Sequence, residues 1–352
     1  MTERLGTAVV AGATGVAGRA ILEHLATSGR WDCVALSRRP PDAAGRYYHI
    51  AVDLADPADC AEKLAILGDA THVFHAAYVE RAEPEAHAAD NLAMLRNLLV
   101  AIEPVAKRLR HVHLVEGTKW YGSHLGPFRT PAREDDPRPA APVFYHAQQD
   151  LLTRRRRGKA WTWSAIRPHA VCGFSLGSAM NLVSVIAVYA SVMKALGQPL
   201  DFPGTPGGFR ALYQVTDARI LARAVAWMAT EPACADQAFN VTNGDLIRWE
   251  NLWPRIADVM GMPVGRVLTV RLQEAMPQHA GLWQDLQRRH GLKPYRYEDL
   301  AAWRYGDAVF WPEWDIVSST VKVRQAGFPD CIDSEAMLLD LLARYRKEKI
   351  VP

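Results

Sequence analysis

The feature that most constrains this chain is a glycine-rich turn between an apolar run and a helix-compatible stretch near the N-terminus. The apolar run is Ala-Val-Val-Ala at 8–11, the turn is Gly-Ala-Thr-Gly-Val-Ala-Gly at 12–18, and the helical stretch follows at 19–29. Such a turn lets the backbone approach a pyrophosphate and directs a helix N-terminus at its negative charge. The motif, framed by Gly12 and Gly18, therefore predicts a dinucleotide site at the end of a first parallel strand.

The second apolar run leads into Ser37, Arg38 and Arg39, and it lacks the acidic residue that would bind a ribose 2′-hydroxyl. Two guanidinium groups at this point suit the additional 2′-phosphate of NADP(H). The alternative is a structural turn followed by solvated arginines. It would not explain why the glycine-rich turn and the two arginines occur in the order typical of a dinucleotide site. We therefore predict a site that prefers NADP(H).

Strand and helix signals alternate over the first 120 residues. Apolar runs predict strands at 7–11, 32–37, 47–52, 71–76 and 111–115, with helices at 15–28, 57–66 and 87–107. A long loop at 120–141, a helix at 143–156 and a strand at 161–168 follow. Nearly continuous apolar strands separated by helices favour a doubly wound parallel sheet of the Rossmann type, covered on both faces.

The alternation breaks in the second half, which predicts a smaller, mostly helical C-terminal substrate lobe. The apolar run at 179–197 contains several polar residues and is barely long enough for a bilayer, so it favours a buried or dimer-facing helix and leaves a homodimer open. Short strands are expected at 212–216 and 238–242, and helices at 246–262, 280–291 and 334–349. We expect the dinucleotide-binding domain to comprise 1–170 with 212–245, and the substrate lobe to comprise 171–211 with 246–352.

Composition and charge argue against several other classes of protein. A formal net charge of +3 over 352 residues gives no reason to expect a nucleic-acid partner, and the run Arg154–Arg157 before Gly158 suits a solvated helix end. The five cysteines are scattered without a CxxC spacing, so we expect reduced thiols in a cytoplasmic protein. The histidines show no metal-ligand spacing, and we expect neither a metal nor a membrane partner.

Two residues suggest chemistry at the predicted site. Tyr145 begins the helix after the long loop, where short-chain dehydrogenases carry their catalytic tyrosine, but the usual lysine four residues on is Gln149. A phenol, with a pKa of about 10, needs a nearby cation to act at neutral pH. Lys119, just past the fifth strand, is a candidate for that cation. The alternative is a buried, hydrogen-bonded tyrosine and an unrelated surface lysine.

From these positions outward, the chain resembles the progesterone 5β-reductase and iridoid synthase family, an atypical branch of the extended short-chain dehydrogenases/reductases. The matching segments are GATGVAG (12–18), SRR (37–39), THVFHAAY (71–78), GTKWYG (117–122), GPF (126–128), FYHAQQDLL (144–152), WSAIRPHAVCGFS (163–175), AMNLV (179–183), AFNVTNGD (238–245), WRYGD (303–307) and KIVP (349–352). They follow one another along essentially the whole chain.

The resemblance implies specific roles for residues of this chain. It assigns catalysis to Lys119 and Tyr145, and its displaced lysine would account for Gln149. For NADP(H) it implies contacts from Thr14, Gly15, Val16, Arg38, Arg39, Asp53, Leu54, Ala77, Val171, Ser178, Ala179 and Met180. For the substrate it implies Tyr78, Phe128, Met180, Asn181 and Tyr305. Tyr78 and Tyr305 differ from the tryptophan and phenylalanine expected in plant members, which leaves the substrate open.

The implied reaction is the 1,4-reduction of an enone or enal by NADPH, with the enolate oxygen stabilised by Tyr145 and Lys119. A carbonyl reductase or epimerase on the same scaffold is an alternative, as is a non-catalytic NADP(H) sensor. The reductase or epimerase would prefer a serine or threonine donor after the fifth strand, where this chain has Glu116 and Gly117.

Overall fold

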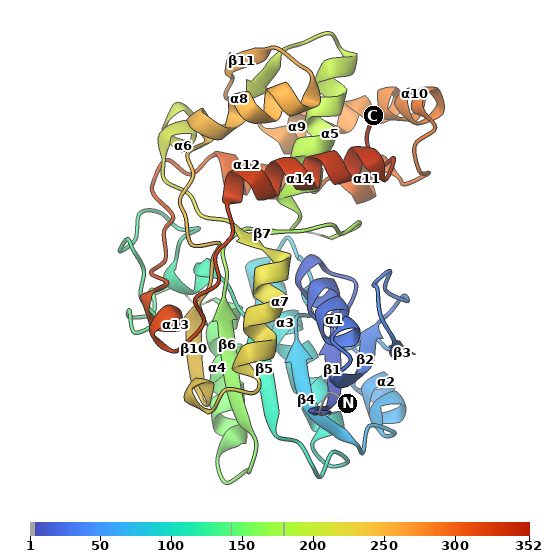
Figure 1. The fold of residues 1–352 in the computed structure, drawn as a ribbon, viewed down its shortest axis with the longest axis vertical. Helices are drawn as coiled ribbons and strands as arrows, with labels where there is room; N and C mark the ends of the chain where they lie inside the picture. The colour runs from blue at the N-terminus through green and yellow to red at the C-terminus, as the bar shows by residue number, and fades with distance from the viewer. Residues whose placement is uncertain (1–3, 142, 179) are drawn as a thin grey trace.

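The computed structural model describes residues 4–141, 143–178 and 180–352, and its largest element is a parallel sheet (Figure 1). Seven strands lie in the order β10-β6-β5-β4-β1-β2-β3. They are β1 (Gly6–Ala11), β2 (Trp31–Ser37), β3 (Tyr47–Ala51), β4 (Ala70–His75), β5 (His111–Val115), β6 (Thr162–Arg167) and β10 (Gln237–Asn240). Since β1 pairs with both β2 and β4, the sheet is doubly wound with its switch point between β1 and β4. The predicted Rossmann-type architecture is confirmed.

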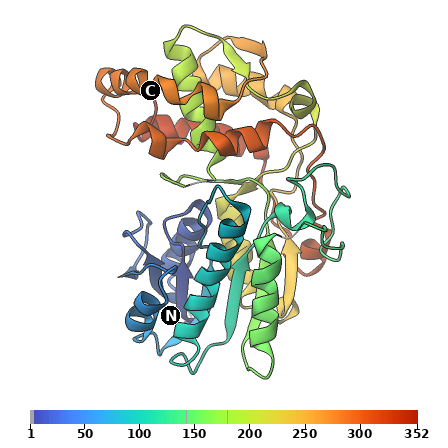
Figure 2. The same ribbon diagram turned by 180° about the vertical axis from the view of Figure 1, so that it is seen from behind.

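Helices cover both faces of this sheet (Figures 1 and 2). One face carries α1 (Val16–Thr27) and α7 (Ala218–Met228), and the other carries α2 (Pro57–Leu64), α3 (Pro84–Ile102) and α4 (Phe144–Arg156). Alternate strand residues serve the two layers, because successive side chains of a strand point to opposite faces. Val10 packs with α1 and α7, whereas Val9 packs with α2, α3 and α4. Helix α7 was not among the helices predicted from the sequence.

The second lobe is mostly helical and lies beyond the carboxyl ends of the strands (Figure 1). It contains α5 (Leu182–Ala195), α6 (Pro206–Arg210), α8 (Trp249–Met260), α9 (Leu272–Ala275), α10 (Ala280–His290), α11 (Tyr297–Leu300), α12 (Trp303–Phe310), α14 (Ser334–Lys347), β8 (Leu200–Phe202) and β11 (Val264–Val267). The apolar run predicted as a buried helix is α5, whose residues 182–192 are all buried. No helix in the described part of the chain is both long and apolar enough to span a bilayer.

The chain passes between the two lobes more often than the predicted boundaries allow. Helix α13 (Val321–Gln325) packs against β10 in the sheet lobe, although residues 246–352 were assigned to the substrate lobe (Figure 1). The strand predicted at 212–216 is wrong, because Tyr213 makes only isolated bridges there. The short strand that follows, β9 (Thr216–Asp217), pairs with β7 (Val171–Cys172) and not with the large sheet.

Candidate active site

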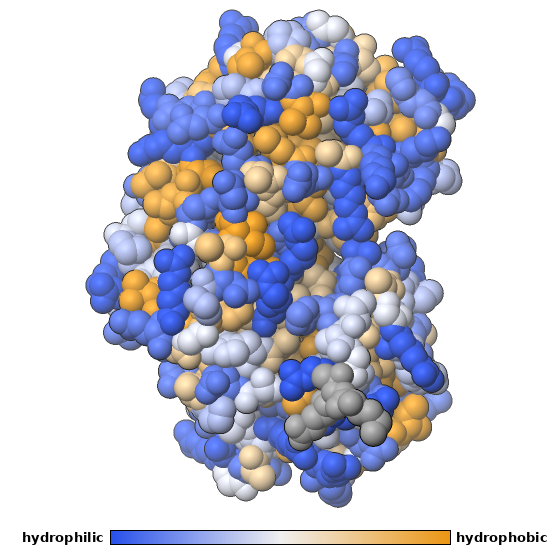
Figure 3. All heavy atoms as spheres, viewed as in Figure 1, coloured by the Kyte–Doolittle hydropathy of each residue, from blue (hydrophilic) through white to orange (hydrophobic). Residues whose placement is uncertain are grey.

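A cavity of about 880 Å³ lies between the carboxyl edge of the sheet and the helical lobe. The surface on one face of the molecule is largely hydrophilic, and its outline narrows between the two lobes (Figure 3). Both the glycine-rich turn and the candidate catalytic residues line this cavity. Segments far apart in the sequence therefore meet at the place where parallel α/β proteins bind their ligands.

The glycine-rich turn is shaped by close backbone contacts. Gly12 has a φ of 81°, and a Cβ atom there would lie 2.5 Å from the backbone nitrogen of Ala77. A Cβ atom on Gly18 would collide with the carbonyl oxygen of Gly12, so α1 can pack tightly on the turn only with glycine at this position. Gly15 is the N-cap of α1 and offers no capping side chain, so the first N–H groups of the helix are free to bind an anion.

The arginines after β2 lie at the same end of the cavity. Arg38 and Arg39 are exposed, line the cavity and form no ion pair within the described residues. The hydroxyl of Ser37 donates to the carbonyl oxygen of Arg39 at 2.7 Å, which holds the start of this loop. Asp53 and Leu54 line the cavity beside them. These residues fit a nicotinamide dinucleotide, with two unpaired guanidinium groups available for a 2′-phosphate.

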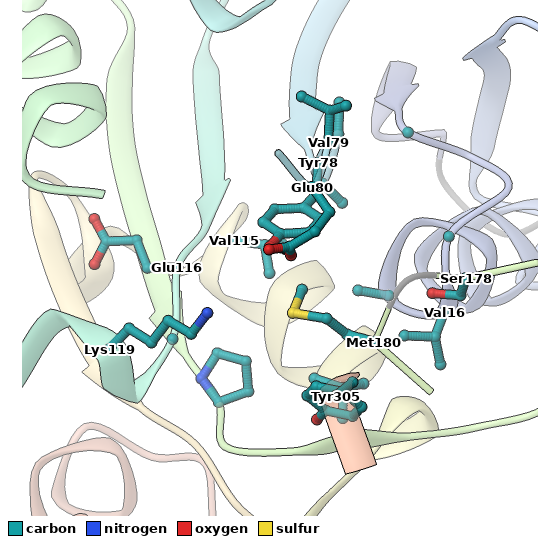
Figure 4. A pocket seen from close by; sticks show the side chains of 18 of the residues that line it. Val16, Tyr78, Val79, Glu80, Val115, Glu116, Lys119, Ser178, Met180 and Tyr305 are labelled. Atoms are coloured by element: carbon teal, nitrogen blue, oxygen red, sulfur yellow. The ribbon is translucent and has the colours of Figure 1, made fainter. Parts of the chain in front are cut away.

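Lys119 and Tyr145 lie on neighbouring elements of the cavity wall. Lys119 belongs to the short helix η1 (Thr118–Tyr121) directly after β5, and its ammonium group points toward the cavity (Figure 4). Tyr145 lies in the first turn of α4. A Cβ atom on Gly117 would lie 3.4 Å from the Tyr145 hydroxyl, so this hydroxyl lies over the backbone two residues before Lys119.

Burial and the nearby charges favour the neutral phenol of Tyr145 and, on balance, lower the pKa of Lys119. Burial raises the pKa of Tyr145, and the nearby carboxylates of Glu116 and Glu80 raise it further. Burial lowers the pKa of Lys119, an effect that the negative charge of Glu80 opposes. Within the described ranges neither the hydroxyl of Tyr145 nor the ammonium group of Lys119 has a hydrogen-bond partner in the protein. Both groups are therefore available to a ligand.

Most of the residues suggested by the sequence line this one cavity. They are Gly12, Thr14, Gly15, Val16, Ser37, Arg38, Arg39, Asp53, Leu54, Ala77, Tyr78, Lys119, Tyr145, Val171, Ser178, Met180 and Tyr305. Ala179 lies outside the described residues. Gly18 packs behind the turn and does not reach the cavity.

Two of the residues proposed for the substrate lie outside the cavity lining. Phe128 packs between the apolar clusters of the two lobes. Asn181 is buried, donates to the carbonyl oxygen of Ser175 at 2.6 Å and the hydroxyl of Tyr345 at 2.8 Å, and caps α5. Because its polar groups are used within the framework, the assignment of Asn181 to the substrate is corrected to a structural role.

Several cavity residues were missed by the sequence analysis. They include Glu80, His124, Arg271, Asp307, Trp311 and Trp314. Glu80 follows β4 closely, so its position after a strand end was a usable signal, and its carboxylate accepts a hydrogen bond from Tyr78. Arg271, Trp311 and Trp314 reach the cavity through the packing of the helical lobe, and no motif recognised in the sequence included them.

The arginine run and the histidines, which were considered above for nucleic-acid and metal binding, lie away from the cavity. The arginine run ends α4, where Arg155 pairs with Glu103 at 2.7 Å and Arg156 pairs with Asp236 at 3.2 Å. The histidines of β4 and β5 are buried within the sheet lobe, and burial lowers the pKa of His72 to about 4 and that of His111 to about 3. These side chains belong to the framework.

Comparison with known proteins gives consistent matches along the chain. The sequence profile of the PRISE-like Rossmann-fold domain matches residues 52–307. The chain is 32% identical to (S)-8-oxocitronellyl enol synthase ISY2 of Nepeta cataria, over 98% of this chain and 91% of that protein. It is also 32% identical to the 3-oxo-Delta(4,5)-steroid 5-beta-reductase of Arabidopsis thaliana, over 98% of this chain and 93% of that protein.

Solved structures share the fold at lower sequence identity. A short-chain dehydrogenase/reductase superfamily protein of Agrobacterium tumefaciens with bound NAD has a TM-score of 0.68 and 17% identity, with 98% of each chain covered. The UDP-N-acetylglucosamine 4-epimerase of Methanobrevibacter ruminantium has a TM-score of 0.69 and 16% identity, with 99% of this chain and 100% of that chain covered.

Proposed function

The chain belongs to the progesterone 5β-reductase and iridoid synthase family and is an oxidoreductase, and from this premise we propose that it is an NADPH-dependent ene-reductase. Its substrate would be an enone or enal, reduced at the C=C bond. Thr14, Gly15 and Val16 would hold the pyrophosphate, and Arg38 with Arg39 would hold the 2′-phosphate. When bound, the reduced coenzyme supplies the hydride.

The two candidate catalytic side chains have distinct tasks in this reaction. The carbonyl oxygen of an enone gains negative charge as its β-carbon accepts hydride, so catalysis requires a group that stabilises an enolate oxygen. Because the pKa of Tyr145 is raised, its hydroxyl keeps its proton and can donate a hydrogen bond to that oxygen. The ammonium group of Lys119 supplies positive charge to the same oxygen. The cavity walls hold the alkene at attack distance.

The observation that carries this proposal is the convergence of Lys119 and Tyr145 on the cavity that also contains the glycine-rich turn. A carbonyl reductase or epimerase of the ordinary type is disfavoured, because Glu116 and Gln149 stand where such an enzyme uses a hydroxyl donor and a lysine. A non-catalytic sensor would have no need for an unpaired hydroxyl and ammonium beside the cofactor site.

Product analysis separates these functions. Purified protein is incubated with NADPH and either 2-cyclohexen-1-one or cyclohexanone, and the products are identified. Saturated ketone without alcohol supports an ene-reductase, alcohol supports a carbonyl reductase, and tight NADPH binding without turnover supports a sensor.

Substitution of the phenol gives a second test. Tyr145→Phe is expected to lower kcat at least tenfold, about 1.4 kcal/mol of activation free energy, with little change in NADPH affinity. Tyr295→Phe, at an exposed position outside the cavity, is the matched control. Equal turnover in Tyr145→Phe and wild type would remove Tyr145 from the mechanism.

A further inference from the structure

A buried ion pair lies behind the candidate catalytic residues. Glu116 directly follows β5, and Arg167 is the last residue of the adjacent strand β6. The Nε atom of Arg167 donates to Oε2 of Glu116 at 2.7 Å, and the two side chains are only 2% and 0% exposed. The second carboxylate oxygen, Oε1, is buried without a hydrogen-bond partner among the described residues. The carboxylate of Glu116 points away from the ammonium group of Lys119 (Figure 4).

Arg167 also connects the two elements that carry the candidate catalytic pair. Its guanidinium donates to the hydroxyl of Tyr121 at 3.0 Å and lies 3.7 Å from the ring centre of Trp120, so it holds the helix η1. It donates to Oε1 of Gln149 at 3.1 Å, and Gln149 lies one helical turn along α4 from the candidate tyrosine. The position that ordinarily carries the catalytic lysine is therefore used here to attach α4 to Arg167.

The ionisation of Glu116 changes the charge of this cluster. When Glu116 is ionised, its negative charge acts on Tyr145, and when it is protonated, that negative charge is absent. Burial raises the pKa of Glu116 to about 7, although Arg167 acts in the opposite direction. The negative charge of Glu116 in turn raises the pKa of Tyr145.

The other charged groups around Glu116 largely cancel one another. The titratable and charged side chains that surround the pair are Arg138 and Glu134 from the long loop, Tyr121 from η1, Tyr145, His146 and Asp150 from α4, and Lys322 from α13. Arg138 and Asp150 form a two-bond ion pair at 2.7 and 2.9 Å, so their opposite charges act together. Glu134 uses its carboxylate to accept from the backbone N–H of Asn240. Burial lowers the pKa of His146 and keeps it neutral, Lys322 and Glu134 carry opposite charges, and Glu116 is the carboxylate that pairs directly with Arg167.

We propose that Glu116 and Arg167 are positioning residues for the reduction, and that protonation of Glu116 removes a negative charge from beside Tyr145. This inference rests on the proposed ene-reductase function. The negative charge of ionised Glu116 destabilises the enolate oxygen that Tyr145 contacts, whereas protonated Glu116 does not. Turnover therefore falls as the pH rises through neutrality, and it falls because of Glu116.

The first experiment compares the pH dependence of kcat in wild type and Glu116→Gln. Wild type is expected to lose about tenfold in kcat between about pH 6 and about pH 8, the size expected for one unit charge acting through partly buried protein. Glu116→Gln keeps the shape of the side chain, and its kcat should stay near the acid-side value over this interval. Glu103→Gln removes a carboxylate from a comparable arginine pair outside the cavity and should keep the wild-type profile. If kcat of Glu116→Gln falls with pH as it does in wild type, the proposal is overturned.

A second variant tests positioning without changing any charge. Gln149→Leu breaks the contact between Arg167 and α4 at a half-buried site, so folding should tolerate it. We expect kcat to fall about fivefold, while the decrease of kcat with rising pH is the same as in wild type. NADPH affinity should stay within about twofold of wild type. An unchanged kcat contradicts the positioning role, and this variant decides that role even if Glu116→Gln fails to fold.

Urea unfolding provides a readout that needs no turnover. A raised pKa means that the folded protein holds this proton more tightly than the unfolded chain, so its stabilisation is present at low pH and is lost as the pH rises through the folded pKa. The unfolding midpoint of wild type should therefore fall relative to that of Glu116→Gln between about pH 5 and about pH 8. A constant difference between the two midpoints shows that Glu116 does not titrate there and refutes the inference. Absence of enone turnover in wild type would instead count against the proposed function.

Discussion

Replacing Gln149 by lysine would restore the tyrosine–lysine spacing of ordinary short-chain dehydrogenases, yet we expect it to weaken this protein. In those enzymes the lysine one turn after the tyrosine supplies the cation. Here the same place faces the guanidinium of Arg167, which donates to Oε1 of Gln149 at 3.1 Å. A lysine would exchange this acceptor for a second positive charge.

The size of the effect follows from that distance. Two unit charges about 4 Å apart repel each other by about 4 kcal/mol at an effective dielectric constant of about 20. Position 149 is half-buried, so a lysine can turn partly toward solvent, and Glu116 already compensates Arg167. We therefore expect a loss of about 2 kcal/mol in the free energy of unfolding. Gln149→Leu, which removes the hydrogen bond without adding charge, should lose about 1 kcal/mol.

Urea unfolding and enone turnover together test this reasoning. The unfolding midpoint should decrease in the order wild type, Gln149→Leu, Gln149→Lys. Lys119→Met should lose at least about tenfold in kcat, and adding Gln149→Lys to it should not restore turnover. Restored turnover in the double variant would show that the cation can act from position 149, and a stabilised Gln149→Lys would show that Arg167 does not contact this side chain as described.

Three further predictions concern other parts of the cavity. Arg38→Ala combined with Arg39→Ala should weaken NADPH binding by at least about tenfold more than NADH binding, measured by fluorescence titration, and equal losses would refute the 2′-phosphate assignment. Gly18→Ala should lower the free energy of unfolding by about 1–3 kcal/mol in urea, because its Cβ would collide with the carbonyl oxygen of Gly12; a neutral effect would contradict the tight turn. Glu80→Gln should improve kcat/KM for 4-oxo-2-pentenoic acid relative to its methyl ester about tenfold, since the Glu80 carboxylate at the cavity repels an anionic substrate; an unchanged ratio would exclude that repulsion.

The sheet lobe could be predicted because its signals are local. The run from Ala8 to Gly18 contains a strand, a turn and a helix start within a few residues, and each has its own chemical signature. Parallel strands then bring their carboxyl ends to one edge, so residues that follow strands, such as Arg38, Tyr78 and Lys119, meet there without further information.

Elements that depend on non-local pairing were not predictable in this way. Helix α7 has a local start signal, since Asp217 caps it by accepting from the backbone N–H of Arg219. The strand before it has only two residues, so the sequence shows no clear alternation of strand and helix there. Tyr213 lies in an apolar run typical of a strand and yet forms only isolated bridges, because its neighbours are Ile247 and Ile316 from distant parts of the chain. Asn181 is a similar case. Its side chain donates hydrogen bonds to the carbonyl oxygen of Ser175 and to the hydroxyl of Tyr345, and the contact with Tyr345 depends on the folded lobe.

The two walls of the cavity differ in the same way, one being formed by local signals and the other by non-local packing. The groups assigned to hydride addition follow β5 or begin α4, so the scaffold itself brings them to the sheet edge. The opposite wall comes from the helical lobe, where Tyr305, Trp311 and Trp314 reach the cavity through tertiary packing alone. Substitutions in that wall can change the shape of the cavity without moving the phenol of Tyr145 or the ammonium group of Lys119. In the proposed reduction, the sheet would therefore supply the catalytic pair, and the second lobe would supply the wall that selects the substrate.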